Sequence, residues 1–335
     1  MFVYLTPANC LESEPLLTQA SLHQNFHFPQ GILGSTPWYN QNARKPGWRP
    51  TPTRLDGARR LPGHQGRQRG TFSMKCNKHD SLQHDFPFNF WIGCHRLSEG
   101  CKNCYMFLAQ EHRPWTNPNE VKRCTSRWGE PLRWQRKAEK AGEYKSVFAC
   151  SYSDFFLPEA DGWRDDAWAL IRQTPNLIWQ LASKRTNLIA DRLPKDWGNG
   201  YKNVWLGTSA ELKKYLPRLD YLREIPCTLR WLDFAPLLED LTPELSEHID
   251  GFGWVNASGE TGCNYVEPRP FDPQWARNIR ELCSKKGIPF YFSHTAGRKR
   301  HPDRLLDGVT YNDTPPLVPK VSENKPGGCE ITMSA

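Results

Sequence analysis

The sequence predicts an α/β protein organised around a parallel sheet. Apolar runs of strand length, rich in β-branched and aromatic residues, alternate with segments of helical periodicity along most of the chain. Strands that alternate with helices pair in parallel through right-handed crossovers. This order fits either a barrel or an open doubly wound sheet. The predicted strands span residues 88–93, 146–150, 176–182, 203–208, 227–233, 252–257 and 288–293.

Helical segments between the predicted strands carry their apolar residues on one face. One such segment begins after Asp272, which is followed by Pro273, and ends at Gly287. Proline in the first turn and glycine just past the last turn are typical of helix boundaries. The apolar faces comprise Trp163, Ala167, Leu170 and Ile171 in an earlier segment and Trp275, Ile279, Leu282 and Cys283 in this one.

Composition divides the 335 residues into three regions. Residues 1–73 are predicted to be a disordered basic arm, because the stretch 40–70 carries eight Lys and Arg residues against one acid, with many Pro and Gly. A nucleic-acid-binding arm and a reading frame that truly begins at Met74 are two alternatives. Residues 74–312 contain the predicted strands and form the main domain. Residues 313–335 lack periodicity and are predicted to be a disordered tail.

Charge and cysteine content indicate the class of protein. A formal net charge of +8 permits an acidic partner such as nucleic acid without requiring one. No apolar run is long enough to span a bilayer, so no membrane partner is expected. The N-terminus lacks a secretory signal pattern, and eleven cysteines without a disulfide framework suit a reducing compartment. The protein is therefore expected to be cytoplasmic.

Three cysteines lie within one short stretch, with six residues between Cys94 and Cys101 and two between Cys101 and Cys104. Three thiolates are one short of the four that close a structural zinc or iron–sulfur site. A metal centre with an open position is suited to chemistry rather than to holding a fold. If the centre is a 4Fe–4S cluster, its unligated iron can accept an external molecule. The spacing favours this interpretation.

Two other interpretations of the cysteines remain open. Cys76 and His79 form a second pair upstream, which could join Cys101 and Cys104 in a tetrahedral zinc site. Alternatively, the thiols are unliganded and buried, because a free cysteine behaves as a small apolar residue.

Together with the cysteine loop, six further segments resemble a phage and bacterial protein family of unknown function. The hallmark of that family is the three-cysteine loop, and it is regarded as radical-SAM-like. This chain departs from the family pattern at Ala235, where the family has an acidic residue, and at Ser293-His294, where the family has Lys-Gln. Its six residues between the first two cysteines also differ from the three of the usual radical-SAM loop. The matching segments, in the family's order, are 153–156, 183–185, 203–207, 235–238, 259–262 and 289–292.

The resemblance implies a TIM-like parallel barrel that need not close, a 4Fe–4S cluster and S-adenosylmethionine (SAM). Active sites of such folds lie at the C-terminal ends of the strands. Polar residues at those positions are therefore candidates, although each also has a plain structural explanation, such as capping a turn. The candidate catalytic residues are Asp154, Lys184 and Asp233, the cofactor-binding candidates are Gly259, Glu260, Arg185 and Thr208, and the metal ligands are Cys94, Cys101 and Cys104.

Charge suggests how these residues would meet SAM. Glu260 would accept hydrogen bonds from its amino group or ribose hydroxyls, and Gly259 would allow close approach of the backbone. Lys184 or Arg185 would neutralise a carboxylate or a substrate phosphate. The expected function is a radical-SAM-like iron–sulfur enzyme that acts on a nucleic-acid base or nucleotide.

Basic residues mixed with aromatics support a nucleic-acid or nucleotide partner. The segment 122–145 is rich in Lys and Arg and contains Trp128 and Trp134, and a second basic cluster occupies 298–301. A solvated helix with internal ion pairs explains 122–145 equally well. Two rival functions remain: a zinc-stabilised nucleic-acid-binding or nuclease-like protein without redox chemistry, and a catalytically silent subunit with an unknown partner protein.

Overall fold

The computed structural model describes residues 84–111, 117–262, 266–297 and 304–317. Contacts divide the chain into Met1–Thr71 and Phe72–Ala335, and every described residue belongs to the second unit. Several predictions therefore lie outside the described residues. These are the basic arm of residues 1–73, the zinc ligands Cys76 and His79, the basic cluster 298–301 and the tail from residue 318 onwards.

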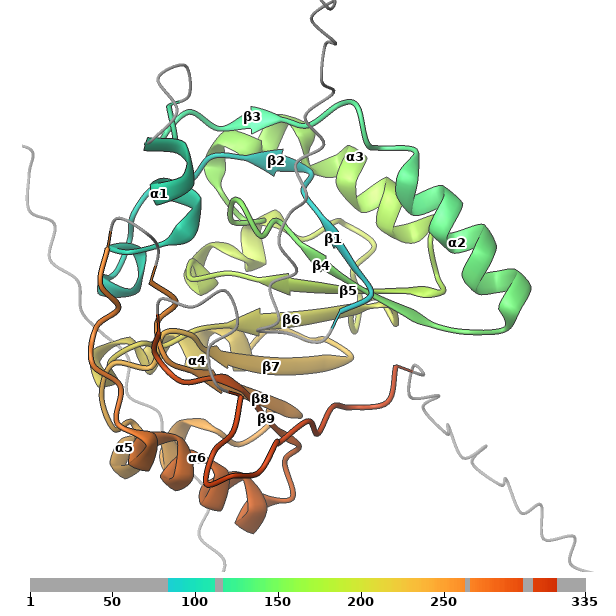
Figure 1. Cartoon of the computed structure of the whole chain (residues 1–335). Coiled ribbons are helices and arrows are strands. Elements are labelled where there is room, and N and C mark those ends of the chain that lie inside the picture. The colour runs from blue at the N-terminus through green and yellow to red at the C-terminus, as the bar shows by residue number, and fades with distance from the viewer. Residues whose placement is uncertain (1–83, 112–116, 263–265, 298–303, 318–335) are drawn as a thin grey trace, which may run out of the picture. The chain divides into compact units, whose positions relative to one another are not determined.

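Seven parallel strands form one sheet that curls into a half-barrel (Figure 1). Each strand pairs with the next one of the sheet along the chain, and the order never reverses. This order excludes an open doubly wound sheet, whose strand order reverses at a switch point, and confirms the TIM-like, incomplete barrel. The strands in sheet order are β1 (Phe86–Phe88), β4 (Lys145–Ala149), β5 (Leu177–Ala182), β6 (Val204–Thr208), β7 (Leu229–Phe234), β8 (Trp254–Ser258) and β9 (Phe290–His294).

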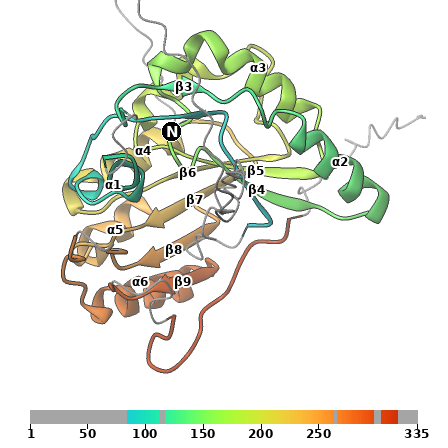
Figure 2. The ribbon, with the colours of Figure 1, turned by 45° about the horizontal axis from the view of Figure 1, so that its top comes forward.

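Helices pack on the sheet, with α2 against β5, α4 against β6, and α6 against β8 and β9 (Figure 2). The main apolar core includes residues from both the sheet and these helices. Six α-helices are described: α1 (Tyr105–Glu111), α2 (Glu130–Ala141), α3 (Asp161–Arg172), α4 (Pro217–Arg223), α5 (Thr242–His248) and α6 (Pro273–Lys286). Short 3-10 helices span Glu99–Cys101, Pro158–Ala160, Thr186–Leu188, Ala190–Arg192 and Lys213–Tyr215.

The boundaries of α6 follow the sequence signals. The Asp272 carboxylate accepts a hydrogen bond from the Gln274 amide at 2.8 Å, and Pro273 occupies the first turn. Gly287 ends the helix with a φ of +65°, a left-handed conformation that glycine adopts at little cost. The predicted helix and its apolar face are thus confirmed.

The predicted strand over 88–93 is divided in two. Phe88 ends β1, and the chain then turns, so that β2 (Trp91–Ile92) pairs antiparallel with β3 (Lys122–Arg123) in a separate small sheet. The turn occurs at Asn89, whose side-chain oxygen accepts the Tyr152 amide at 2.9 Å. This contact holds Asn89 against the loop after β4, at the point where β1 ends.

The concave face of the half-barrel carries two layers of side chains. Trp205, Trp231, Trp254 and Tyr291 form a buried aromatic cluster with Ile178. Side chains on one face of a strand recur every second residue. Asp233, Asn256 and Ser293, two residues after Trp231, Trp254 and Tyr291, therefore form a polar layer nearer the C-terminal strand ends.

The segment 122–145 contains a helix with internal ion pairs, which was the alternative to a nucleic-acid partner. Trp134 stacks on Phe86 with ring centroids 4.3 Å apart, and Trp128 packs edge-on to Phe90. Glu130 pairs with two arginines within the helix region, Arg127 and Arg133. Both tryptophans are thus in contact with core aromatic rings. Across the described ranges, the helices are too short and too polar to cross a bilayer.

Candidate functional site

The three predicted metal ligands line one cavity. Cys94, Cys101 and Cys104 all face a space of about 150 Å³ at the C-terminal ends of β4 and β5. A second cavity of about 210 Å³ adjoins it and shares Cys101 and Cys104. The cysteine loop, residues 93–105, therefore lies at the strand ends, where a parallel barrel places its active site.

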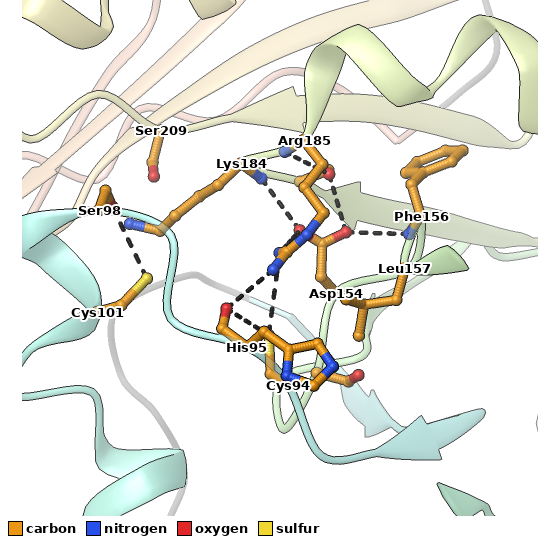
Figure 3. A network of polar contacts seen from close by, with 12 residues as sticks. Cys94, His95, Ser98, Cys101, Asp154, Phe156, Leu157, Lys184, Arg185 and Ser209 are labelled. Carbon is orange, nitrogen blue, oxygen red and sulfur yellow. Dashed lines mark hydrogen bonds and ion pairs between the residues drawn. The ribbon is translucent and has the colours of Figure 1, made fainter. Parts of the chain in front are cut away.

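Asp154, after β4, fixes the beginning of the cysteine loop through Arg185 (Figure 3). The Asp154 carboxylate is 3.1 Å from the Arg185 guanidinium and also accepts the Ser183 hydroxyl at 2.8 Å. Arg185 in turn donates to the His95 carbonyl at 2.8 Å, with its other terminal nitrogen 3.9 Å from the Cys94 sulfur. Both side chains are buried, so Asp154 and Arg185 act as an internal anchor for the first cysteine.

Glu211, after β6, fixes the middle of the loop. Its carboxylate is fully buried, pairs with Lys184 and lies 3.1 Å from Arg218. It also accepts the Ser98 hydroxyl at 3.0 Å. A Cβ atom on Gly100 would collide with this carboxylate, so only glycine allows the loop to pass so close.

Glu260, after β8, fixes the end of the loop. Arg269 binds this carboxylate through its side chain and its backbone amide, and Asn103 donates to it at 2.9 Å. Burial opposes ionisation, but these hydrogen bonds lower the pKa of Glu260 below its usual value. Arg269 also donates to the Glu99 carbonyl at 2.9 Å. Glu260 therefore holds Asn103, one of the two residues between the second and third cysteines.

The remaining candidates differ in their access to the cavities. Asp233 lines both cavities, and Gly259 lines the second. A Cβ atom on Gly259 would meet the backbone of Ala296, so the close approach at this glycine is to the protein's own chain. Thr208 is fully buried, and its hydroxyl has no hydrogen-bond partner among the described residues. Its neighbour Ser209 lines the first cavity instead.

The local electrostatics differ among the three thiols. Burial and the nearby Asp154 raise the pKa of Cys94 to about 12, and burial raises the pKa of Cys104. At Cys101 burial opposes ionisation, but the Lys184 ammonium and backbone amides lower the pKa of the thiol. Because metals bind thiolates, ligation at this site would release protons.

Three thiols that line one cavity are donors of the kind that iron–sulfur clusters use. In the described part of the chain, no three His, Cys, Asp or Glu side chains converge closely enough to hold one metal ion. The ligands of a four-iron cluster bind separate irons and do not need to converge on one point. Lys184 and Arg185 line the same cavity as the thiols, and each already pairs with a carboxylate, Glu211 and Asp154 respectively.

A fourth cysteine reaches the same cavity. Cys150 directly follows β4 and lines the cavity together with the three loop cysteines. It is 4% exposed and packs in the main apolar core. Burial raises the pKa of its thiol far above the usual value. Because Cys94 and Cys104 also have raised pKa values, the pKa does not distinguish Cys150 from them. Its packing in the apolar core does, and we assign Cys150 to the core.

Comparison with known protein families shows to which family the chain belongs. A family model described as a protein of unknown function, DUF5131, matches residues 83–315, more than half of the chain. The chain belongs to the DUF5131 family. The matched residues contain the cysteine loop, all seven strands of the half-barrel and the three carboxylates that anchor the loop.

Similarity of this DUF5131 protein to better-characterised proteins is low. No curated protein matches the chain. A solved radical SAM methyltransferase from Sphaerobacter thermophilus is similar with 12% sequence identity and a TM-score of 0.41. The likeness covers 63% of this chain and 66% of that chain, just under two thirds of its length. It assigns neither an activity nor a cofactor to the DUF5131 chain.

Sequence reasoning missed Glu211, Arg269 and Asn103 in this DUF5131 protein. For Glu211 a signal was present. It follows a predicted strand by three residues, much as Glu260 follows its strand, and the strand-end rule applies to both. For Arg269 no such signal exists. It lies outside the predicted strands and helices, nine residues after Glu260, and its other partner, Glu99, is 170 residues away.

Proposed function

We propose that the protein is a radical-SAM-like iron–sulfur enzyme. Cys94, Cys101 and Cys104 would hold a 4Fe–4S cluster with one iron free of protein ligands. The observation that carries the proposal is that three thiols from one short loop line a single cavity, with Lys184 and Arg185 beside them. A three-thiolate set leaves an open coordination position in the manner of catalytic metal sites.

SAM would bind at the second cavity, which adjoins Cys101 and Cys104. That cavity is lined by acceptors and donors suited to an amino acid and a ribose, among them Glu260, Asn103 and Thr261. Glu260 already accepts from Arg269 and Asn103, so the SAM amino group would add to an ordered carboxylate. When bound, a reduced cluster supplies the electron that cleaves the sulfonium of SAM.

The chain's own contribution is to order the loop and shield it from water. Asp154, Glu211 and Glu260 hold successive parts of the loop through buried ion pairs. Rigid support of this kind limits the geometry that ligands can adopt.

Metal analysis of anaerobically purified full-length protein tests the proposal. We expect about four irons and four sulfides per chain and a brown colour. The iron, the sulfide and the colour should all be lost when Cys94, Cys101 or Cys104 is changed to Ala. Cys150→Ala is the matched control, because it removes a thiol from the same cavity, and it should retain the cluster.

Two results would contradict the proposal in different ways. Loss of the cluster in Cys150→Ala would indicate four protein ligands and no open iron. Stoichiometric zinc without iron or sulfide, lost on changing Cys76 or His79, would instead establish a zinc-stabilised protein.

A further inference from the structure

A line of hydrogen bonds crosses the inner face of the half-barrel and ends at Asp233. The Ser293 hydroxyl donates to the Asn256 oxygen at 2.7 Å, and the Asn256 amide donates to Asp233 at 2.5 Å. Ser293 and Asn256 are fully buried, whereas Asp233 is partly exposed and lines both cavities. Two buried donors in series therefore orient one carboxylate towards the cavities.

Asp233 differs from the other carboxylates that line the cavities. Asp154 pairs with Arg185 and Glu260 pairs with Arg269. For Asp233, by contrast, the described residues supply no ion pair and one hydrogen-bond donor, Asn256. Burial raises its pKa to about 6, even though Asn256 and the more distant Lys184 lower it. An incompletely neutralised carboxylate in an enclosed site is costly unless a ligand completes its hydrogen bonding.

Asp233 shares both cavities with two aromatic side chains and a lysine. Phe148 and Tyr105 line both cavities, as does Lys184. Lys184 keeps Glu211 as its partner, but an ammonium has three hydrogens to donate. The site thus combines an acceptor at Asp233, a donor at Lys184 and an aromatic wall.

We propose that Asp233 binds the edge of a substrate nucleobase. Such an edge carries an N–H or amino donor that Asp233 can accept and a ring nitrogen or carbonyl acceptor for a donor such as Lys184, and the base has a flat face for Phe148. The substrate role rests on the proposed function, whereas binding of the base does not require the cluster. The adenine of SAM presents the same chemistry and is the competing occupant.

Calorimetry on full-length protein, with and without saturating SAM, tests this proposal with guanosine, adenosine, cytidine and uridine as probes. We expect at least one nucleoside to bind in the presence of SAM. The analogue of that nucleoside methylated at its donor nitrogen should bind about ten- to a hundredfold more weakly, as expected for loss of a hydrogen bond to a charged group.

Asp233→Asn should weaken nucleoside binding by a similar factor and leave SAM affinity unchanged. Asp165→Asn removes one negative charge from the exposed face of α3 and is the matched control. If Asp233→Asn does not fold, the methylated analogue on wild-type protein decides the question.

Three results would overturn the proposal: no binding of any nucleoside, equal binding of the methylated analogue, or loss of SAM affinity alone in Asp233→Asn. Iron content and SAM affinity, measured on the same samples, separate this proposal from the proposed function. Nucleoside binding without a cluster would support the base site alone. A cluster and SAM binding without nucleoside binding would support the enzyme alone.

Discussion

Glu211 is a fully buried carboxylate that holds the middle of the cysteine loop. It pairs with Lys184 and Arg218 and accepts from Ser98. Its charge is compensated, but removing it would leave two cations near each other in a site of low polarity. Such an uncompensated buried charge is much less stable than the intact pair.

Glu211→Gln is therefore expected to lower the free energy of unfolding by roughly 3–5 kcal/mol. Glu244→Gln is the matched control, because Glu244 pairs with Lys213 at an exposed position, and its loss should cost less than about 1 kcal/mol. Urea denaturation of the cluster-free proteins measures both. Equal small losses would show that Glu211 does not anchor the site.

Asp233 should make stability depend on pH. Its pKa is raised in the folded protein to about 6 from 3.8, so the folded state binds the proton more tightly than the unfolded state. Stability from this group is present below about pH 4 and falls as pH rises through 6. Asp233→Asn has no titratable group at this position and therefore does not lose stability over this pH range.

Relative to wild type, Asp233→Asn should gain up to about 3 kcal/mol of stability between pH 4 and pH 7. Denaturant titrations of both cluster-free proteins at the two pH values give the difference directly. A difference that is constant with pH would contradict the raised pKa.

The sequence predicts the positions of single site residues better than it predicts their roles. Asp154, Lys184, Arg185, Asp233, Gly259 and Glu260 all line the cavities, because the strand-end rule depends only on the order of strands. Lys184, Arg185 and Glu260 were expected to meet a ligand, yet each already pairs with a residue of the protein. Those partners lie nine to 31 residues away and are brought close only by the fold.

At the scale of elements, apolar runs predicted six strands of the sheet to within two residues at each end. The bounds of the first strand, predicted over 88–93, are wrong, because the chain turns after Phe88 and Asn89 bonds the loop after β4. Local sequence carries no sign of that remote contact. The cysteine loop likewise depends on a contact 111 residues away, where Gly100 lies against Glu211.

Gly100→Ala should displace the loop and lower the amount of iron bound per chain. The added Cβ atom would collide with the Glu211 carboxylate. Gly162→Ala is the matched control, because Gly162 lies in α3 with open space around it. That change should stabilise the helix by up to about 1 kcal/mol and leave iron binding unchanged. Full iron content in Gly100→Ala would mean that the loop tolerates movement.

At the scale of the whole molecule, three carboxylates after alternate strands, β4, β6 and β8, hold the cysteine loop across the end of the half-barrel. The loop is thereby tied to the sheet along its length. We expect the main domain to contain everything that this arrangement requires, since the family match begins at residue 83.

A chain that begins at Met74 should therefore unfold at the same temperature as the full chain and bind the same amount of iron. Thermal melts and iron analysis of the two chains provide the comparison. A large loss of stability would show that residues 1–73 contain a structural element, contrary to their composition.

The electron paramagnetic resonance spectrum of the reduced, cluster-loaded protein shows whether one iron of the cluster has an open coordination position. SAM that reaches an unligated iron changes the environment of the cluster. We expect the spectrum to shift when SAM is added to wild type and to Cys150→Ala alike. A cluster signal that SAM leaves unchanged in both proteins would contradict an open coordination position.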